Sequence, residues 1–209
     1  AATMQRRLEQ LDAPARRVLR AGSIFGGRFR RSGVLALLGG QMSSTELRQT
    51  LATLVAQELL TNSLEHAGMS RVSAVSSDVV LSFRHGLLRD AAYASLTDAD
   101  RHTGHRLAAS WLIETGEVDA GLIADHFERA AVPERAIPYW SQAAKFALEA
   151  QDYELAVRSA ERGIVAGAAG EVRGRLRRMQ SEANSWAYRW DDSRRLAREA
   201  MELSVEGSD

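Results

Sequence analysis

Residues 79–93 read VVLSFRHGLLRDAAY, and the pattern changes from strand to helix within this stretch. The alternation over residues 79–83 predicts a strand with one buried face. From residue 87 onward, apolar residues recur at helical spacing and predict a helix. His85 and Gly86 lie where the period changes. Because the first turn of a helix favours negative charge, we predict that His85 is well placed to meet an anion.

Upstream of this stretch, the chain predicts helices followed by strands. The expected elements are helices at 4–21, at 32–38 and from 44 onward, a short buried connection at 22–29, and a strand at 59–64. Ser43 and Glu46 fit a capping box at the start of the third helix. Residues 67–77, rich in Ser and Gly, predict a loose hairpin tip. Three helices and then two strands are typical of a winged helix, which we assign to residues 1–96.

Downstream, residues 97–209 predict one helix after another. The helices come in pairs spaced by roughly 34–40 residues, which is the spacing of tetratricopeptide (TPR) repeats. Residues 137–170 fit best, with Trp140 at the aromatic position and Ala144 at the helix contact. The expected fold is therefore mainly α: a winged helix with a small β-hairpin, followed by an antiparallel TPR-like arm with a concave face.

Composition narrows the possible functions. The chain has 209 residues, 45% of them apolar, and no Cys, which excludes disulfides and thiolate catalysis. No apolar run approaches the ~20 residues of a membrane helix and no signal peptide is visible, so we expect no membrane contact and a cytoplasmic location. The opening AATM suggests a fragment of something longer. Residues 1–96 hold 12 Arg against 7 acidic residues, whereas residues 97–209 hold 15 basic against 20 acidic residues, which suggests two domains with different surfaces.

Residues 84–90, RHGLLRD, resemble the MHDLLRD or MHDLVRD segment of the STAND signalling ATPases. This class includes nucleotide-binding leucine-rich-repeat receptors and large bacterial transcription regulators. Residues 136–156, AIPYWSQAAKFALEAQDYELA, resemble the helical arm of bacterial members that are fused to cyclase, kinase or LuxR-type output domains. The resemblance implies a bacterial protein of signal transduction or transcription regulation.

The resemblance also implies a mechanism. In that family, a P-loop domain N-terminal to the winged helix holds ADP or ATP, and the motif histidine contacts the β-phosphate of ADP. This role falls on His85, and Arg84 is a second candidate for sensing the nucleotide. Gly86 replaces the family's acidic residue. Because this chain lacks the G-x-x-x-x-G-K-[ST] motif, we expect a non-enzymatic fragment without a cofactor of its own, whose parent protein binds ADP or ATP.

Two other functions are left open. As a stand-alone scaffold, the arm would bind a protein or a small effector in a groove that uses Trp140, Tyr153 and Trp186. As a DNA-binding regulator, the helix that begins at residue 44 would contact DNA through Arg48, Gln49 and Thr50. DNA binding is disfavoured because that helix carries one Arg and two Glu.

Several histidine and acidic side chains are candidate ligands for a metal ion. The candidates are His102, His105, Asp125 and His126. Zinc needs three or four such ligands, and histidines on a surface or in a core are commoner, so we expect no metal site. No spacing of Ser, His, Asp or Glu suggests a catalytic site.

Overall fold

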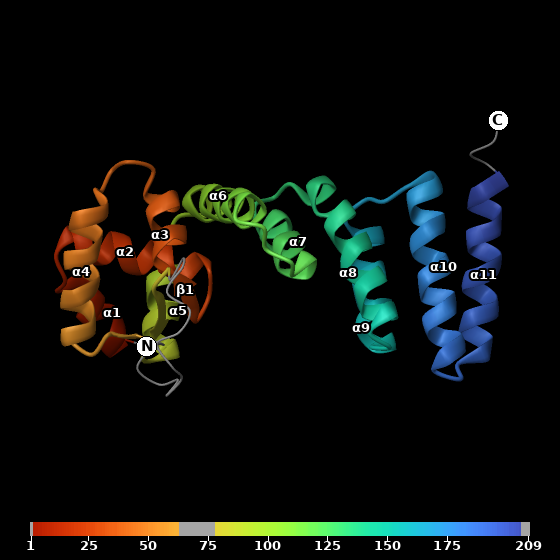
Figure 1. Ribbon diagram of the computed structural model, residues 1–209, viewed down its shortest axis with the longest axis horizontal. Coiled ribbons are helices and arrows are strands. Elements are labelled where there is room, and N and C mark those ends of the chain that lie inside the picture. The colour runs from red at the N-terminus through yellow and green to blue at the C-terminus, as the bar shows by residue number, and fades with distance from the viewer. Residues whose placement is uncertain (1, 63–77, 206–209) are drawn as a thin grey trace. The chain divides into compact units, whose positions relative to one another are not determined.

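The computed structural model describes residues 2–62 and 78–205, and within these ranges the chain is mainly helical (Figure 1). It has 11 α-helices and a small antiparallel sheet in these ranges. The contacts divide the chain into two compact units, Ala1–Leu112 and Ile113–Asp209. The predicted hairpin tip at 67–77 lies outside the described residues. No helix in the described ranges has the length and apolar character needed to cross a membrane.

The first unit contains helices and the three strands. Its elements are α1 (Ala2–Glu9), α2 (Ala13–Ile24), β1 (Arg28–Arg30), α3 (Arg31–Leu38), α4 (Ser44–Ala56), β2 (Leu60–Asn62), β3 (Val80–Phe83), α5 (Gly86–Ala94) and most of α6 (Asp98–Glu114). One helix was expected over residues 4–21, but two form. The side chain of Asp12 accepts a hydrogen bond from Ala15 N at 2.8 Å, which caps a new helix, and Pro14 suits its first turn.

The sheet has the strand order β1-β3-β2, with both pairs antiparallel. Phe29 pairs with Leu81, and Leu60 pairs with Phe83, so these four apolar residues share the buried face. Strand β1 was expected to be part of a connection. Its Arg-Phe-Arg alternation spans only three residues, which is too short a signal to distinguish a strand from a turn.

An aspartate from outside α3 caps this helix. Arg30 at the N-cap position makes no capping bond through its side chain. Instead, Ser32 N donates to Asp78 Oδ1 at 3.1 Å, and the Ser32 hydroxyl donates to the same carboxylate. Arg31 N donates to Val79 O at 2.9 Å. The start of α3 is therefore fixed to the residues that lead into β3.

Helix α6 packs within the first unit as far as Leu112. The rings of Phe25 and Trp111 meet edge to face, with centroids 5.4 Å apart. A Cβ atom at Gly104 would lie 2.9 Å from Ile24 Cδ1, so α6 approaches α2 closely. Because of these contacts, the division between units falls after Leu112, inside α6 and downstream of the expected boundary at 96/97.

The second unit is a series of helices: α7 (Ala120–Arg129), the 3-10 turn η1 (Pro133–Arg135), α8 (Ile137–Glu149), α9 (Tyr153–Val165), α10 (Gly170–Trp186) and α11 (Trp190–Val205). Asp119 caps α7 and Asp152 caps α9, each accepting from a backbone N–H three residues ahead. Helices α10 and α11 run antiparallel, side by side (Figure 1).

Helices α8 and α9 meet along small side chains. Ala144, Ala156 and Ala160 are fully buried there. A Cβ atom at Gly163 would lie 3.0 Å from Leu176 Cδ1 and 3.2 Å from Trp140 Cβ. We call these four small residues the small-residue seam. It lets the two helices approach closely and leaves no room for larger side chains.

Candidate functional site

His85 lies between the end of β3 and the first turn of α5, and its side chain is exposed. It is the N-cap residue of α5, with φ −130° and ψ 125°, and its carbonyl oxygen accepts from Leu88 N at 3.0 Å. Its imidazole makes no capping hydrogen bond. The ring therefore remains available to an outside group, beside the positive end of the helix dipole.

Neighbouring backbone holds this position. Phe83 N donates to Gly27 O at 2.9 Å, and Arg84 N donates to Leu59 O at 3.1 Å. The end of β3 is thus bonded on both sides, toward β1 and toward β2. His85 thus lies where the strand ends and the helix begins, which is the position that the sequence pattern predicts.

Arg84 faces a glutamate from the end of α4. Arg84 Nη1 lies 3.6 Å from Glu58 Oε1, and both side chains are substantially exposed. Glu58 has a left-handed φ of 57° just after α4, and Leu59 N then bonds back to Leu54 O at 3.0 Å. An exposed pair of this kind contributes only ~0–1 kcal/mol, so Glu58 compensates the charge of Arg84 without immobilising it.

Gly86 occupies the first position of α5 without a local need for glycine. Its φ is not left-handed, and no heavy atom lies within 4 Å of a Cβ built there. An acidic side chain at this position would therefore project from the first turn without a clash.

The three DNA-contact candidates lie on α4. Arg48 and Gln49 are exposed, whereas Thr50 is only half-exposed. Arg48 Nη2 donates to Thr45 Oγ1 at 3.3 Å. The three residues are consecutive, so helical geometry spreads them around α4, and one face cannot present all three to a DNA groove.

The three arm candidates occupy different environments in the second unit. Trp140 is buried, its Nε1 donates to Glu128 Oε1 at 2.6 Å, and the Arg162 guanidinium lies 4.1 Å from its ring centroid. Tyr153 begins α9 and is half-buried. Trp186 is 62% exposed and lines a cleft of about 830 Å³ between α10 and α11. Trp140 is thus part of the hydrophobic core, whereas Trp186 is accessible to solvent.

A charged cluster joins α7 and α9 beside Trp140. Arg162 Nη2 donates to Asp125 Oδ1 at 3.0 Å and also bonds Glu128, while Arg129 Nε donates to Asp125 Oδ2 at 2.6 Å. Burial raises the pKa of Asp125, but the hydrogen bonds from Arg162 and Arg129 outweigh it and leave this pKa below its ordinary value. The cluster is therefore internally neutralised and has a structural role.

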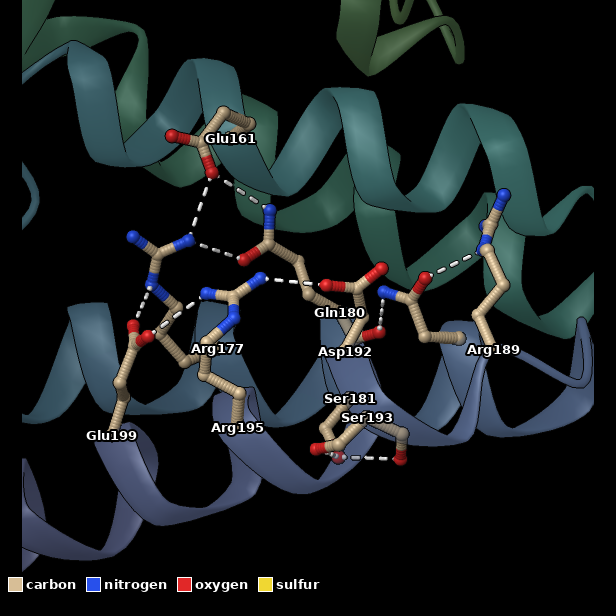
Figure 2. Close-up of polar contacts among 10 residues, drawn as sticks. Glu161, Arg177, Gln180, Ser181, Arg189, Asp192, Ser193, Arg195 and Glu199 are labelled. Atoms are coloured by element: carbon tan, nitrogen blue, oxygen red, sulfur yellow. Dashed lines mark hydrogen bonds and ion pairs between the residues drawn. The ribbon is translucent and has the colours of Figure 1, made fainter.

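A second polar network connects α9, α10 and α11 around a cleft of about 460 Å³ (Figure 2). Arg177 reaches Glu161 at 2.9 Å and Glu199 at 3.1 Å. The buried Gln180 donates to Glu161 Oε2 at 2.9 Å and accepts from Arg177 at 2.7 Å. The hydrogen bond from Gln180 is the main cause that lowers the pKa of Glu161; burial opposes it and the nearby Arg177 charge adds to it.

The network continues into α11. Arg195 pairs with Asp192 at 2.9 Å and with Glu199 at 3.0 Å, and Arg189 Nε donates to Asn184 Oδ1 at 2.7 Å (Figure 2). Sequence analysis missed this network. The signal was present in α10, where the amides Gln180 and Asn184 fall on the same face as apolar residues, since buried amides require hydrogen-bond partners.

The histidines considered for a metal are used in other ways. His105 is buried against Tyr93, and His126 is buried in α7. Burial lowers the pKa of His126 to about 4, partly opposed by the charge of Asp125. Within residues 2–62 and 78–205, no group of three or more His, Cys, Asp or Glu is arranged to hold a metal ion.

A scan against protein-family models, a search of curated proteins and a search of solved structures each found no match. The geometry of the described residues therefore has to carry any functional assignment. One residue and two clefts are accessible. The residue is His85 at the start of α5; one cleft opens beside α4 in the first unit, and the other beside Trp186 in the second.

Proposed function

We propose that this chain is a non-catalytic regulatory part of a STAND-type signalling ATPase, with a winged helix that senses a nucleotide phosphate through His85 and a TPR-like arm that relays the state. Support for the winged helix comes from the element order α2-β1-α3-α4-β2-β3 and the strand order β1-β3-β2, both of which are typical of that fold. The helix pairs α8–α9 and α10–α11 support the TPR-like arm.

The observation that carries the proposal is the exposed imidazole of His85 on a fixed backbone at the start of α5. A ring in this position would donate a charge-assisted hydrogen bond to a phosphate at ~2.7–2.9 Å, helped by the helix dipole. Leu87, in the same turn, is 58% exposed and offers an apolar contact to the module that holds the nucleotide.

A change at the start of α5 would reach α6 through contacts within the first unit. Tyr93 OH lies 2.9 Å from His105 Nε2, and Arg101 donates to the carbonyl oxygens of Tyr93 and Ala94 at 3.4 and 3.2 Å. These bonds tie the end of α5 to α6. Losing the phosphate would shift a two-state equilibrium by the free energy that His85 contributes to the bound state.

The test uses the full-length parent protein. His85→Ala should lower the ADP content of the purified protein and speed ADP release by roughly 10- to 100-fold, as expected for a lost charge-assisted hydrogen bond of about 1.5–3 kcal/mol. His102→Ala is the matched control, because His102 is also exposed but lies on α6. An unchanged ADP release rate in His85→Ala would refute the proposed role.

The second candidate, a stand-alone scaffold, is favoured by the accessible Trp186 beside its cleft. In this function the arm binds a protein or small effector whether or not a nucleotide is present. A partner that binds the same chain with unchanged affinity in the His85→Ala variant, but fails to bind Trp186→Ala, supports the scaffold. Equal binding to both variants removes Trp186 from consideration.

A further inference from the structure

The first unit contains a cleft of about 370 Å³ that neither proposed function uses. It opens between α4 and the strands β2 and β3. Its lining includes the amide of Asn62 and is otherwise largely apolar: Leu51, Ala52, Val55, Ala56, Val79 and Leu81. A cleft of this volume lies within the ~300–1,000 Å³ range of small-molecule sites.

Two arginines, Arg31 and Arg48, also line this cleft. Arg48 donates one hydrogen bond to the Thr45 hydroxyl, and no ion pair joins either arginine to another described residue. Asp78 precedes the lining residue Val79 in the sequence, and its carboxylate already accepts hydrogen bonds from Ser32. The cleft therefore combines an apolar floor with two arginines that form no ion pair with any residue in the described ranges.

We propose that this cleft binds a small amphipathic carboxylate, with its hydrocarbon body on Leu51, Val55 and Leu81 and its carboxylate between Arg31 and Arg48. Arginine matches a carboxylate with two parallel hydrogen bonds, which makes it a strong partner for this group. A DNA backbone would satisfy the arginines but has no hydrocarbon chain to cover the floor. The charge pattern and the apolar lining together favour the carboxylate.

The ligand's size follows from the cleft. A chain of about eight carbons fits a cleft of about 370 Å³. Octanoate is therefore a suitable probe. Octanamide, which has the same chain and no charge, is the matched probe for the headgroup.

The experiment titrates octanoate into the 209-residue protein by isothermal titration calorimetry, with 1H–15N spectra to locate the site. Octanoate should bind saturably and shift the amides of α4 and β3, and octanamide should bind about tenfold more weakly. Arg31→Gln and Arg48→Gln should each weaken octanoate binding about tenfold. Arg17→Gln, which changes an exposed arginine of α2 outside the cleft, should leave binding unchanged.

A variant that fills the cleft separates the site from general effects of charge. Ala56 lines the cleft and is exposed, so Ala56→Trp should abolish octanoate binding while the circular dichroism spectrum and Tm stay close to wild type. The proposal is overturned if octanoate does not saturate, if octanamide binds equally well, or if Ala56→Trp still binds. It is also overturned if duplex DNA, in a salt-dependent manner, binds through Arg31 and Arg48 while octanoate does not.

Discussion

The hydroxyl of Tyr93 lies 2.9 Å from Nε2 of His105, and this contact joins the last turn of α5 to the middle of α6. The two rings meet edge to face with centroids 5.8 Å apart, and the Arg101 guanidinium lies over the Tyr93 ring at 5.1 Å. The C-terminal end of α5, away from His85, is thus anchored to α6 by these side-chain contacts.

Removing this hydroxyl should destabilise the first unit. Tyr93→Phe keeps the ring but leaves a nitrogen of the buried His105 without this partner, at a cost of about 1–2 kcal/mol in the free energy of unfolding. Urea denaturation followed by circular dichroism measures the change. Tyr188→Phe is the control, because Tyr188 is 80% exposed, and it should change stability by less than about 0.5 kcal/mol. Equal effects of the two variants would show that the Tyr93–His105 contact contributes nothing.

A carboxylate at position 86 should stabilise the protein. Gly86→Asp replaces a flexible residue in the first turn of α5 and places a negative charge at the positive end of the helix dipole, with a gain of about 0.5–1 kcal/mol. Urea denaturation midpoints test this. Gly86→Lys removes the same glycine but introduces the opposite charge, so it should gain less than Gly86→Asp. A lower stability of Gly86→Asp than of wild type would contradict the open space around this position.

Stability should fall in mild acid because of His126. Burial lowers its pKa to about 4 from an ordinary value of 6.5, so between these pH values the unfolded chain binds a proton that the folded chain does not. The contribution of His126 is complete above pH 6.5 and is lost as the pH falls through this window, by up to about 3 kcal/mol near pH 4. Urea denaturation at a series of pH values from 7 to 4 measures the loss.

The His126→Gln variant provides the comparison. Glutamine does not titrate, so its curve of stability against pH should be flatter than that of wild type between pH 6.5 and 4, whatever its stability at pH 7. His102→Gln changes an exposed histidine and should retain the wild-type slope. Identical slopes for wild type and His126→Gln would show that this ring titrates normally in the folded protein.

The polar network in the second unit should contribute through Arg177. Its side chain is 14% exposed and pairs with both Glu161 and Glu199. Arg177→Met leaves the exposed Glu161 and the half-buried Glu199 without this cation, and should cost about 2 kcal/mol. Arg194→Met removes a pair with Asp191 that lies in solvent, and it should cost less than about 0.5 kcal/mol. Thermal or urea unfolding compares them, and similar losses would mean that burial adds nothing to the network.

Much of the local structure was readable from the sequence. Ser43 caps α4, as predicted, because capping depends on a short polar side chain beside an apolar repeat. The change from strand to helix at His85 was also predicted, and Gly86 begins α5. Mainly helical structure with a small antiparallel sheet is confirmed. The caps and the change from strand to helix depend on residues within a few positions of one another.

Features made by distant residues were not readable. Glu58 meets Arg84 only because β2 pairs with β3, and Asp78 caps α3 only because β1 pairs with the same strand. The cleft lined by Arg31 and Arg48 likewise brings together residues of α3, α4 and the sheet. No spacing along the chain encodes such contacts. They follow from the tertiary arrangement, which the sequence determines but which cannot be read from the spacing of its residues.

The small-residue seam has a mechanical consequence for the second unit. Ala144, Ala156, Ala160 and Gly163 are buried, and a Cβ atom at Gly163 would lie only 3.2 Å from Trp140 Cβ, so small side chains let the two helices approach closely. At these four positions the contact resists compression, since alanine has no rotamer to change and glycine has no side chain. We therefore expect a displacement of one of these helices to carry the other with it.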